Sequence, residues 1–314
     1  MRITSCFLVL AHVMLGLVAS SAFALPGRGE LDAWTPLAGA WEGSGTDAAG
    51  ATAVKASLES LFGGRFLVLH TSEQRADQSV REELEVWSGG ETPGAFVYHA
   101  KDPFQRLPGA VDADGAALSA GDAKTRITWH RTADGLTGTR EEADATGALV
   151  ATGSWTLKRG ARDVDGPEVE LIGKFKGEGE TCAMIGSAVG VHFNAVEEGS
   201  LALSSGILIT RQTYTYADRV EQALFIHGVE HDKPFRHEFH SKGAVLALTG
   251  AFVDVGQMAF TTDMPAGKLK VSTVEVCHGY KLETEILRPG TTAAVWVGSA
   301  DMYIQHGKRW QPRR

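Results

Sequence analysis

Four histidines lie close together in residues 227–240, where polar and apolar residues alternate on either side of a short turn. They are His227, His231, His237 and His240. Imidazole nitrogens are common ligands of zinc and copper. Two strands joined by a turn would bring His227 and His237 side by side, with Glu230 and His231 at the tip. The segment therefore predicts a hairpin with the residue types of a metal site.

The preferred interpretation of this hairpin is nevertheless a solvated element that responds to pH. His237 and His240 fall on opposite faces of a strand, and the spacing in the turn matches no established ligand pattern. We therefore predict no cofactor, and zinc and haem remain alternatives.

Acidic residues also gather at two places, residues 82–85 and 141–144. They are Glu82, Glu83 and Glu85, then Glu141, Glu142 and Asp144. Paired acids can divide into a general acid and a general base when one of them is buried. Adjacent strand residues face opposite sides, so we expect a charged outer surface here instead.

The motifs of common enzyme classes are missing from the sequence. No G-x-S-x-G turn follows a long buried strand, and Gly43-Ser44-Gly45 does not lead into the helix that a phosphate-binding glycine loop requires. We predict no catalytic residues, and whether the protein is an enzyme stays open.

Nearly the same motif occurs at the start of two predicted domains. The pattern L-x-G-x-[aromatic]-x-G-x-G occurs at residues 37–45 with Trp41 and again at residues 171–179 with Phe175. Each copy is followed by short runs in which apolar residues alternate, broken by Gly, Asp and Pro. A repeat of this length indicates a duplicated domain.

Five runs in each copy are predicted to be strands. In the first copy they are residues 65–70, 83–87, 95–99, 126–130 and 153–157, and in the second 207–210, 223–227, 235–239, 269–274 and 294–297. Many short antiparallel strands leave exposed edges unless the sheet closes. The predicted fold is therefore all-β, with two tandem antiparallel calycin- or lipocalin-like barrels, and a two-sheet sandwich is the alternative. Trp41 or Phe175 is expected to plug one end of its barrel.

The ends of these domains follow from composition. Residues 1–24 have Arg2 near the start, an apolar stretch at residues 7–18 and the triplet Ala22-Phe23-Ala24, which together are typical of a signal peptide cleaved after Ala24. The polar, turn-rich residues 160–167 form a linker. The domains predicted are thus residues 25–159 and residues 168–314, the second being a divergent copy. The protein is expected to be periplasmic or secreted.

Charge and length limit the classes of partner. The mature chain has 290 residues, and its 29 basic and 38 acidic side chains give a net charge near −9. That sign disfavours nucleic acid and anionic membranes as partners. No other segment is long and apolar enough to enter a bilayer.

The mature chain keeps Cys182 and Cys277, and an oxidising compartment permits a disulfide between them, although two separate thiols fit equally well. The oligomeric state is not predicted.

These residues resemble the calycin superfamily, and within it a bacterial lipocalin-like family of unknown function that opens with L-x-G-x-W-x-G and continues with a G-G-[RK]-F-[LI] strand. The first copy has both motifs, at residues 37–43 and 63–67, and the resemblance covers about residues 31–159. The second copy has Phe175 in place of Trp and Ser205-Gly206-Ile207-Leu208 in place of the second motif. The resemblance implies a barrel with an internal cavity and supplies no catalytic residues.

A related group, the nitrobindin-like haem proteins, shares the G-x-W-x-G opening and binds iron through a histidine of a late strand. The late histidines here, His130, His278 and His306, lie in no matching motif. The sequence therefore predicts a protein that binds a small apolar or amphipathic molecule inside one or both barrels. A haem or metal barrel with redox or isomerase activity is one alternative, and an interaction module with filled barrels is another. The predicted pocket residues are Trp87, Tyr98, Trp129, His227 and His237.

Overall fold

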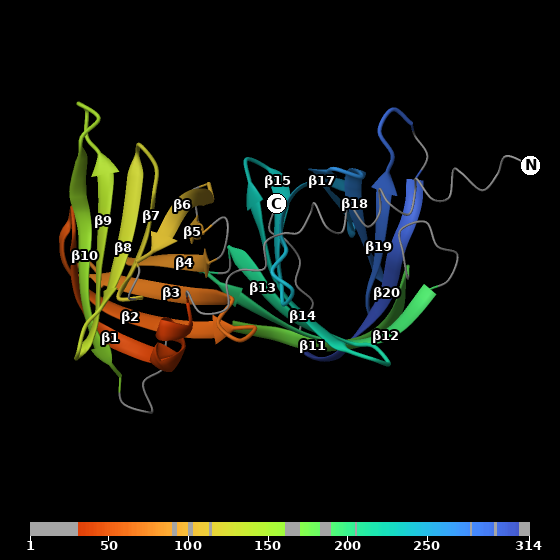
Figure 1. Ribbon diagram of the computed structural model, residues 1–314, viewed down its shortest axis with the longest axis horizontal. Coiled ribbons are helices and arrows are strands. Elements are labelled where there is room, and N and C mark those ends of the chain that lie inside the picture. Colours follow the sequence, from red (N-terminus) through yellow and green to blue (C-terminus); the bar gives the residue numbers. More distant parts are fainter. Residues whose placement is uncertain are drawn as a thin grey trace, which may run out of the picture. The chain divides into compact units, whose positions relative to one another are not determined.

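The computed structural model describes residues 31–89, 93–99, 103–112, 115–160, 170–182, 190–204, 206–276, 278–291 and 294–307. These residues form two closed antiparallel barrels, each of ten strands, and one short 3₁₀-helix. In each barrel every strand pairs with its neighbours in sequence, and the first strand pairs with the last (Figure 1). The predicted all-β fold with tandem closed barrels is confirmed. The predicted signal peptide and residues 161–167 of the predicted linker lie outside the described residues.

The first barrel follows the 3₁₀-helix η1 (Asp32–Leu37). Its strands are β1 (Gly39–Asp47), β2 (Gly50–Leu61), β3 (Phe66–Arg75), β4 (Val80–Ser88), β5 (Gly94–His99), β6 (Gln105–Val111), β7 (Ala117–Gly121), β8 (Thr125–Arg131), β9 (Gly135–Ala143) and β10 (Leu149–Arg159). All five strands predicted for this copy are present, and β2, β6, β7 and β9 had no counterpart in the prediction.

The second barrel has the same plan. Its strands are β11 (Glu170–Cys182), β12 (Gly190–Ala202), β13 (Ile207–Thr215), β14 (Val220–Glu230), β15 (Lys233–His240), β16 (Val245–Asp254), β17 (Gln257–Met264), β18 (Gly267–Val276), β19 (Gly279–Leu287) and β20 (Ala294–Gly307). Among the residues described, no helix has the length and hydropathy needed to cross a bilayer.

The glycines of the repeated opening allow the first strand of each barrel to meet the last. A Cβ on Gly43 would overlap the carbonyl oxygen of Thr156 in β10, and a Cβ on Gly177 would overlap that of Asp301 in β20. Only glycine permits so close an approach of two backbones. The opening pattern therefore marks the seam where each barrel closes.

One end of the first barrel is covered by η1. Trp41 donates a hydrogen bond from Nε1 to the Leu37 carbonyl oxygen at 3.0 Å, and the Arg159 guanidinium lies 5.6 Å from the centre of the Trp41 ring. Arg159 also donates to the carbonyl oxygens of Pro36 and Ala38, at 3.0 and 2.6 Å. The buried Trp41 thus belongs to the seal at this end, as the plug prediction proposed.

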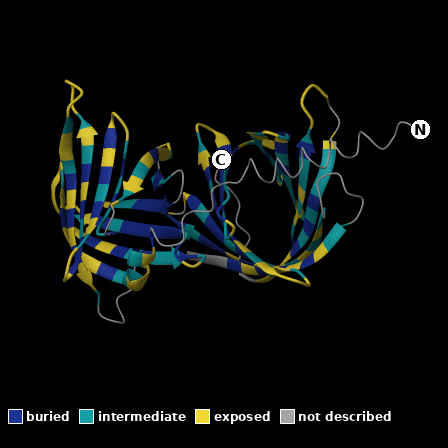
Figure 2. Cartoon of the chain, viewed as in Figure 1, coloured by how far each residue is buried: buried dark blue, intermediate teal, exposed yellow. Residues whose placement is uncertain are grey.

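Alternation of burial along the strands separates an inward face from an outward face. β8 and residues 153–157 of β10 show it plainly, with buried residues at every second position (Figure 2). In the first barrel the inward residues form one apolar core that includes Leu67, Leu69, Ala95 and Val97. This core fixes which face of each neighbouring strand points inward.

Candidate functional site

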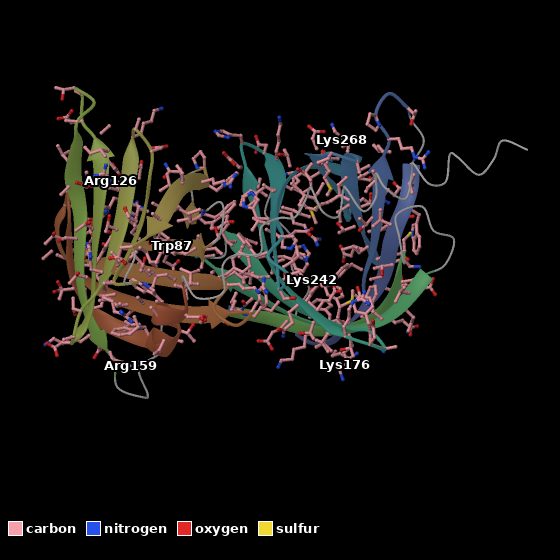
Figure 3. All side chains as sticks on the ribbon, viewed as in Figure 1. Trp87, Arg126, Arg159, Lys176, Lys242 and Lys268 are labelled. Carbon is pink, nitrogen blue, oxygen red and sulfur yellow. The ribbon has the colours of Figure 1, made fainter. Side chains whose placement is uncertain are left out.

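The inward face of β4 carries Glu83, Glu85 and Trp87 at alternate positions. Trp87 is opposite Leu67 and Ala95, and Glu85 is opposite Leu69 and Val97, all of which belong to the interior core. Directly paired residues share a face of the sheet, so these side chains point into the barrel. Trp87 is labelled in Figure 3. The expectation that this acidic group forms an outer charged surface is therefore wrong for Glu83 and Glu85, which are buried.

Glu85 lies between two indole groups and has no exposed surface. Trp87 Nε1 donates to Glu85 Oε2 at 2.6 Å, and Trp129 Nε1 lies 3.1 Å from the same oxygen. The Trp129 ring in turn stacks on Trp155, with centroids 5.2 Å apart. Gly138 allows this stack, because a Cβ there would come within 2.7 Å of both rings.

Glu83 is the anionic member of the group. Arg140 on β9 donates from Nη2 to Glu83 Oε2, His99 Nδ1 lies 3.3 Å from that oxygen, and Arg81 Nη2 lies 3.9 Å from it. Burial acts to raise the pKa of Glu83, but the charges of Arg140 and His99 outweigh burial and hold that pKa below its ordinary value. Arg140 is 3% exposed, and its Nε–H has no hydrogen-bond partner.

The other two carboxyl groups inside the barrel favour the neutral form. Burial, followed by the nearby charge of Glu83, raises the pKa of Glu85 well above its ordinary value. Burial also raises the pKa of Glu73, whose Oε2 accepts a hydrogen bond from Thr52 at 3.5 Å. Glu83 and Glu85 are thus neighbouring acids whose pKa values are shifted in opposite directions, so a proton is held on Glu85 and not on Glu83.

The polar groups lie toward the end of the barrel opposite η1. Ser88 at the end of β4 pairs with Phe66, next to the β2–β3 turn, and η1 reaches that region through a hydrogen bond between Thr35 and Ser60. Arg81 at the other end of β4 pairs with Glu73. The polarity of the interior thus changes along the barrel: tryptophan and leucine side chains lie nearer η1, and carboxyl and guanidinium groups lie farther from it. We refer to Glu73, Glu83, Glu85, Trp87, Trp129 and Arg140 as the acid–tryptophan cluster.

The second barrel also has polar groups inside, and several of them bond to one another, although Arg236 Nε, like Arg140 Nε, has no hydrogen-bond partner of good geometry among the described residues. Glu197 accepts hydrogen bonds from Tyr280 and Gln212, and Tyr214 donates to Gln212 Oε1. Nearby, Arg236 Nε lies 2.7 Å from Glu238 Oε1. Burial alone would raise the pKa of Glu238, but Arg236 and neighbouring histidines lower it to about 2.

The histidine-rich segment forms the predicted hairpin, with a turn at His231 and Asp232, both at positive φ. Its register pairs His227 with Arg236 and His237 with Ile226. His227 and His237 therefore lie on opposite faces of the sheet, which corrects the prediction that they lie side by side. Burial lowers the pKa of His227 to about 3 and that of His237 to about 4. Both histidines are therefore neutral, not titrating near physiological pH.

The remaining predicted pocket residues divide between the two faces. Trp87 and Trp129 point into the first barrel, as expected. Tyr98 lies on the opposite face of β5 from the core residue Val97 and is buried there, so it does not line the interior. Their role in ligand binding stays a prediction. The sequence signal that was missed is the i, i+2 spacing of Glu83, Glu85 and Trp87, which places all three on one face.

Other candidate ligands are scattered or lie outside the described residues. Cys182 Sγ donates to the Trp296 carbonyl oxygen at 3.0 Å, whereas Cys277 is not described, so the predicted disulfide is untested. His130 is exposed on β8, His278 is exposed in a turn, and the side chain of His306 is not described. Within the described ranges, no three His, Cys, Asp or Glu side chains are grouped so that they could hold a metal ion.

Comparison with known proteins places the chain in no characterised group. No model of a known protein family matches it, and no curated protein matches it either. Among solved structures, it is similar to a protein of unknown function from the DUF3598 family of Nostoc punctiforme, with 11% sequence identity and a TM-score of 0.28. That alignment covers 88% of this chain and all of the other. The tandem barrels described above rest on the strand pairing of this chain itself.

Proposed function

We propose that this protein binds a small amphipathic molecule inside its first barrel. The observation that carries the proposal is the acid–tryptophan cluster: three buried carboxyl groups and a buried guanidinium among indole rings, in a barrel covered at one end. Binding sites for small molecules combine apolar and aromatic walls with a few polar groups that orient the ligand. The cluster has this composition.

A purely structural role accounts poorly for the cluster. Burying ionisable groups costs free energy, and apolar side chains of similar volume often stabilise a core as well or better. In the first barrel this cost is not fully offset, because Arg140 Nε has no hydrogen-bond partner. A ligand that supplied an acceptor would account for a polar interior that folding alone does not need.

We further propose that the protein is lipocalin-like and exported. The L-x-G-x-W-x-G opening and the seal of Trp41 and Arg159 under η1 support a ligand-holding barrel of that kind. The features of residues 1–24 support export. Zinc as the bound group is the weaker alternative, because the described residues offer no group of three ligands for it, and haem is an alternative that the adduct measurement distinguishes.

Native mass spectrometry of the purified exported protein tests the proposal. We expect a stoichiometric small-molecule adduct that is lost or depleted in Trp129→Phe, which removes one of the two indole donors to Glu85. Trp296→Phe in the second barrel serves as the matched control and should retain the adduct. A haem absorbance band or a bound metal in place of an organic adduct would favour the alternative. A protein with no adduct that also binds none of a panel of amphipathic probes would contradict the proposal.

A further inference from the structure

Acidic side chains outnumber basic ones inside the first barrel. Glu73, Glu83 and Glu85 are buried there, and Arg140 is the fully buried cation that faces them. The ion pairs of Arg140, Arg81 and His99 all go to Glu83. Among the described residues, no Lys, Arg or His nitrogen lies within 4.0 Å of a carboxylate oxygen of Glu73 or Glu85. Two interior carboxyl groups therefore have no ion pair with a described residue, although the charges of Arg81 and Arg140 act on Glu73 and Glu85 from farther away.

From this imbalance we infer that the ligand of the first barrel is an organic cation, an apolar body with a protonated amine that pairs with Glu85 and Glu73. The inference rests on the proposed function and names the chemical class of its ligand. An ammonium group beside Glu85 would form a charge-assisted hydrogen bond in surroundings where water does not compete.

The aromatic side chains around Glu85 suit the same ligand. Trp87 and Trp129 both direct Nε1–H at the Glu85 carboxyl group, and Trp155 stacks on Trp129. The Nε1–H edges of Trp87 and Trp129 hold the Glu85 carboxyl group in place, and an ammonium group beside it would be attracted by an indole face that no other ring covers. The apolar body of the ligand would pack on the leucine-rich part of the interior.

Arg140 indicates a second feature of the ligand. Its Nη2 is bound to Glu83, whereas its Nε–H is buried without a hydrogen-bond partner. A hydroxyl or carbonyl oxygen close to the amine would satisfy that donor. An anionic ligand fits less well, since the ionised Glu83 would repel it and already balances the charge of Arg140.

Binding of a cation should release a proton. The raised pKa of Glu85 favours its neutral form in the free protein, and pairing with an ammonium group favours its ionised form. The other titratable or charged groups that face Glu85 are Glu73, Glu83, His99, Arg81 and Arg140. We expect a proton to be released as the amine binds, measured as a dependence of the calorimetric binding enthalpy on the ionisation enthalpy of the buffer.

The experiment is a calorimetric and tryptophan-fluorescence titration of the full mature chain with three matched probes. These are 2-amino-1-phenylethanol, 2-phenylethylamine and phenylacetate. We expect 2-amino-1-phenylethanol to bind best, 2-phenylethylamine to bind more weakly because it lacks the oxygen for Arg140, and phenylacetate to bind least. Glu85→Gln should weaken binding of both amines by at least about tenfold, the loss of one charge-assisted contact. Glu42→Gln, at an exposed position of β1, should leave binding unchanged.

Two kinds of result would overturn the inference. If phenylacetate binds as tightly as the amines, the barrel still binds small molecules and only the cationic class is wrong. If none of the three probes binds, the inference fails together with the proposed function. Should Glu85→Gln not fold, Glu73→Gln replaces it, and unchanged amine affinity in that variant would count against the assignment.

Discussion

Arg140 and Glu83 form an ion pair that is almost fully shielded from water, with both side chains 4% exposed. Arg126 and Glu141, on the neighbouring strands β8 and β9, form a second pair with an N–O distance of 3.3 Å, but those side chains are 50% and 30% exposed. The same two residue types thus occur as a buried and as a surface pair in one barrel. They provide a matched comparison of what burial does to an ion pair.

Replacing Arg140 should therefore destabilise the protein far more than replacing Arg126. Arg140→Gln leaves the Glu83 carboxylate buried without its main partner, and we expect a loss of about 3–5 kcal/mol in the free energy of unfolding at pH 7. Arg126→Gln should cost about 1 kcal/mol or less. Urea denaturation measures both changes. Equal losses in the two variants would show that burial of the Arg140 pair has no energetic consequence.

Glu85 should make the protein less stable as pH rises, which is the reverse of the usual behaviour of an acid. Its pKa is raised in the folded protein, so above its ordinary value of 4.5 the unfolded chain loses a proton that the folded chain keeps. The free energy of unfolding then falls with pH by at most about 1.4 kcal/mol per pH unit until pH reaches the folded pKa. Glu85→Gln should reduce the slope above pH 4.5 by the share of Glu85, leaving that of Glu73, whereas Glu42→Gln should leave it unchanged. Urea titrations at several pH values measure it, and parallel curves for wild type and Glu85→Gln would contradict the assignment.

At the scale of elements, the first strand of each barrel carries the closure of the sheet. The same pattern position, Gly43 in β1 and Gly177 in β11, meets the backbone of the last strand in both copies. Gly199 in β12 is a useful contrast, because a Cβ there would meet Leu208 Cδ1 at an ordinary 3.6 Å. Replacing Gly177 or Gly199 by alanine is therefore the same chemical change, and the two variants differ only in the atoms that the added methyl group meets.

Gly43→Ala and Gly177→Ala should each weaken the barrel to which the glycine belongs. The added Cβ forces the paired backbones apart, and overpacking of this kind costs about 1–3 kcal/mol or more. Gly199→Ala should be close to neutral, because the site has room for the methyl group. Thermal unfolding followed by circular dichroism reports the effect. A Gly43→Ala protein as stable as Gly199→Ala would show that the seam can relax without cost.

The prediction of strands succeeded for runs rich in bulky apolar residues and failed for runs with fewer of them. β2 was missed although Thr52, Val54, Ala56 and Leu58 alternate with more exposed residues, and β6 contains Pro108 and Gly109, residues that normally end a strand. Pairing with β5 and β7 keeps β6 in the sheet despite these residues. Closure of the barrel depends on pairing between strands and not on any one segment. It keeps β6 extended despite the tendency of proline and glycine to end a strand.

At the scale of the whole molecule, the chain is one barrel plan used twice with different interiors. In the first interior Glu73 and Glu85 have no ion pair with a described residue, whereas in the second Glu197, Gln212, Tyr214 and Tyr280 bond to one another and Glu238 pairs with Arg236. We therefore expect ligand binding to depend on the first barrel. The proposed export of the protein also concerns the whole chain, and it is tested separately.

The mature protein should begin at Leu25. Expression in a bacterial host with a secretion pathway should give a periplasmic or secreted protein whose intact mass corresponds to cleavage after Ala24, because small residues occupy both outer positions of Ala22-Phe23-Ala24. Ala24→Trp should block cleavage, and Phe23→Leu should not. Intact-mass measurement distinguishes the forms, and an uncleaved wild-type chain would refute the assignment.

The sequence alone determined that the protein is built of short strands, that one domain is present twice, and that the glycine-rich opening begins each copy. These properties follow from local preferences and from comparison of the chain with itself. Only the tertiary structure decided which face of each strand points inward. A period of two separates Glu83, Glu85 and Trp87 from Leu84 and Val86, but both sets are compatible with burial, so the pattern cannot say which set faces the interior. Pairing with the core of the neighbouring strands settles that choice, and it places the carboxyl groups inside the barrel and Tyr98 and His237 on the opposite faces of their strands.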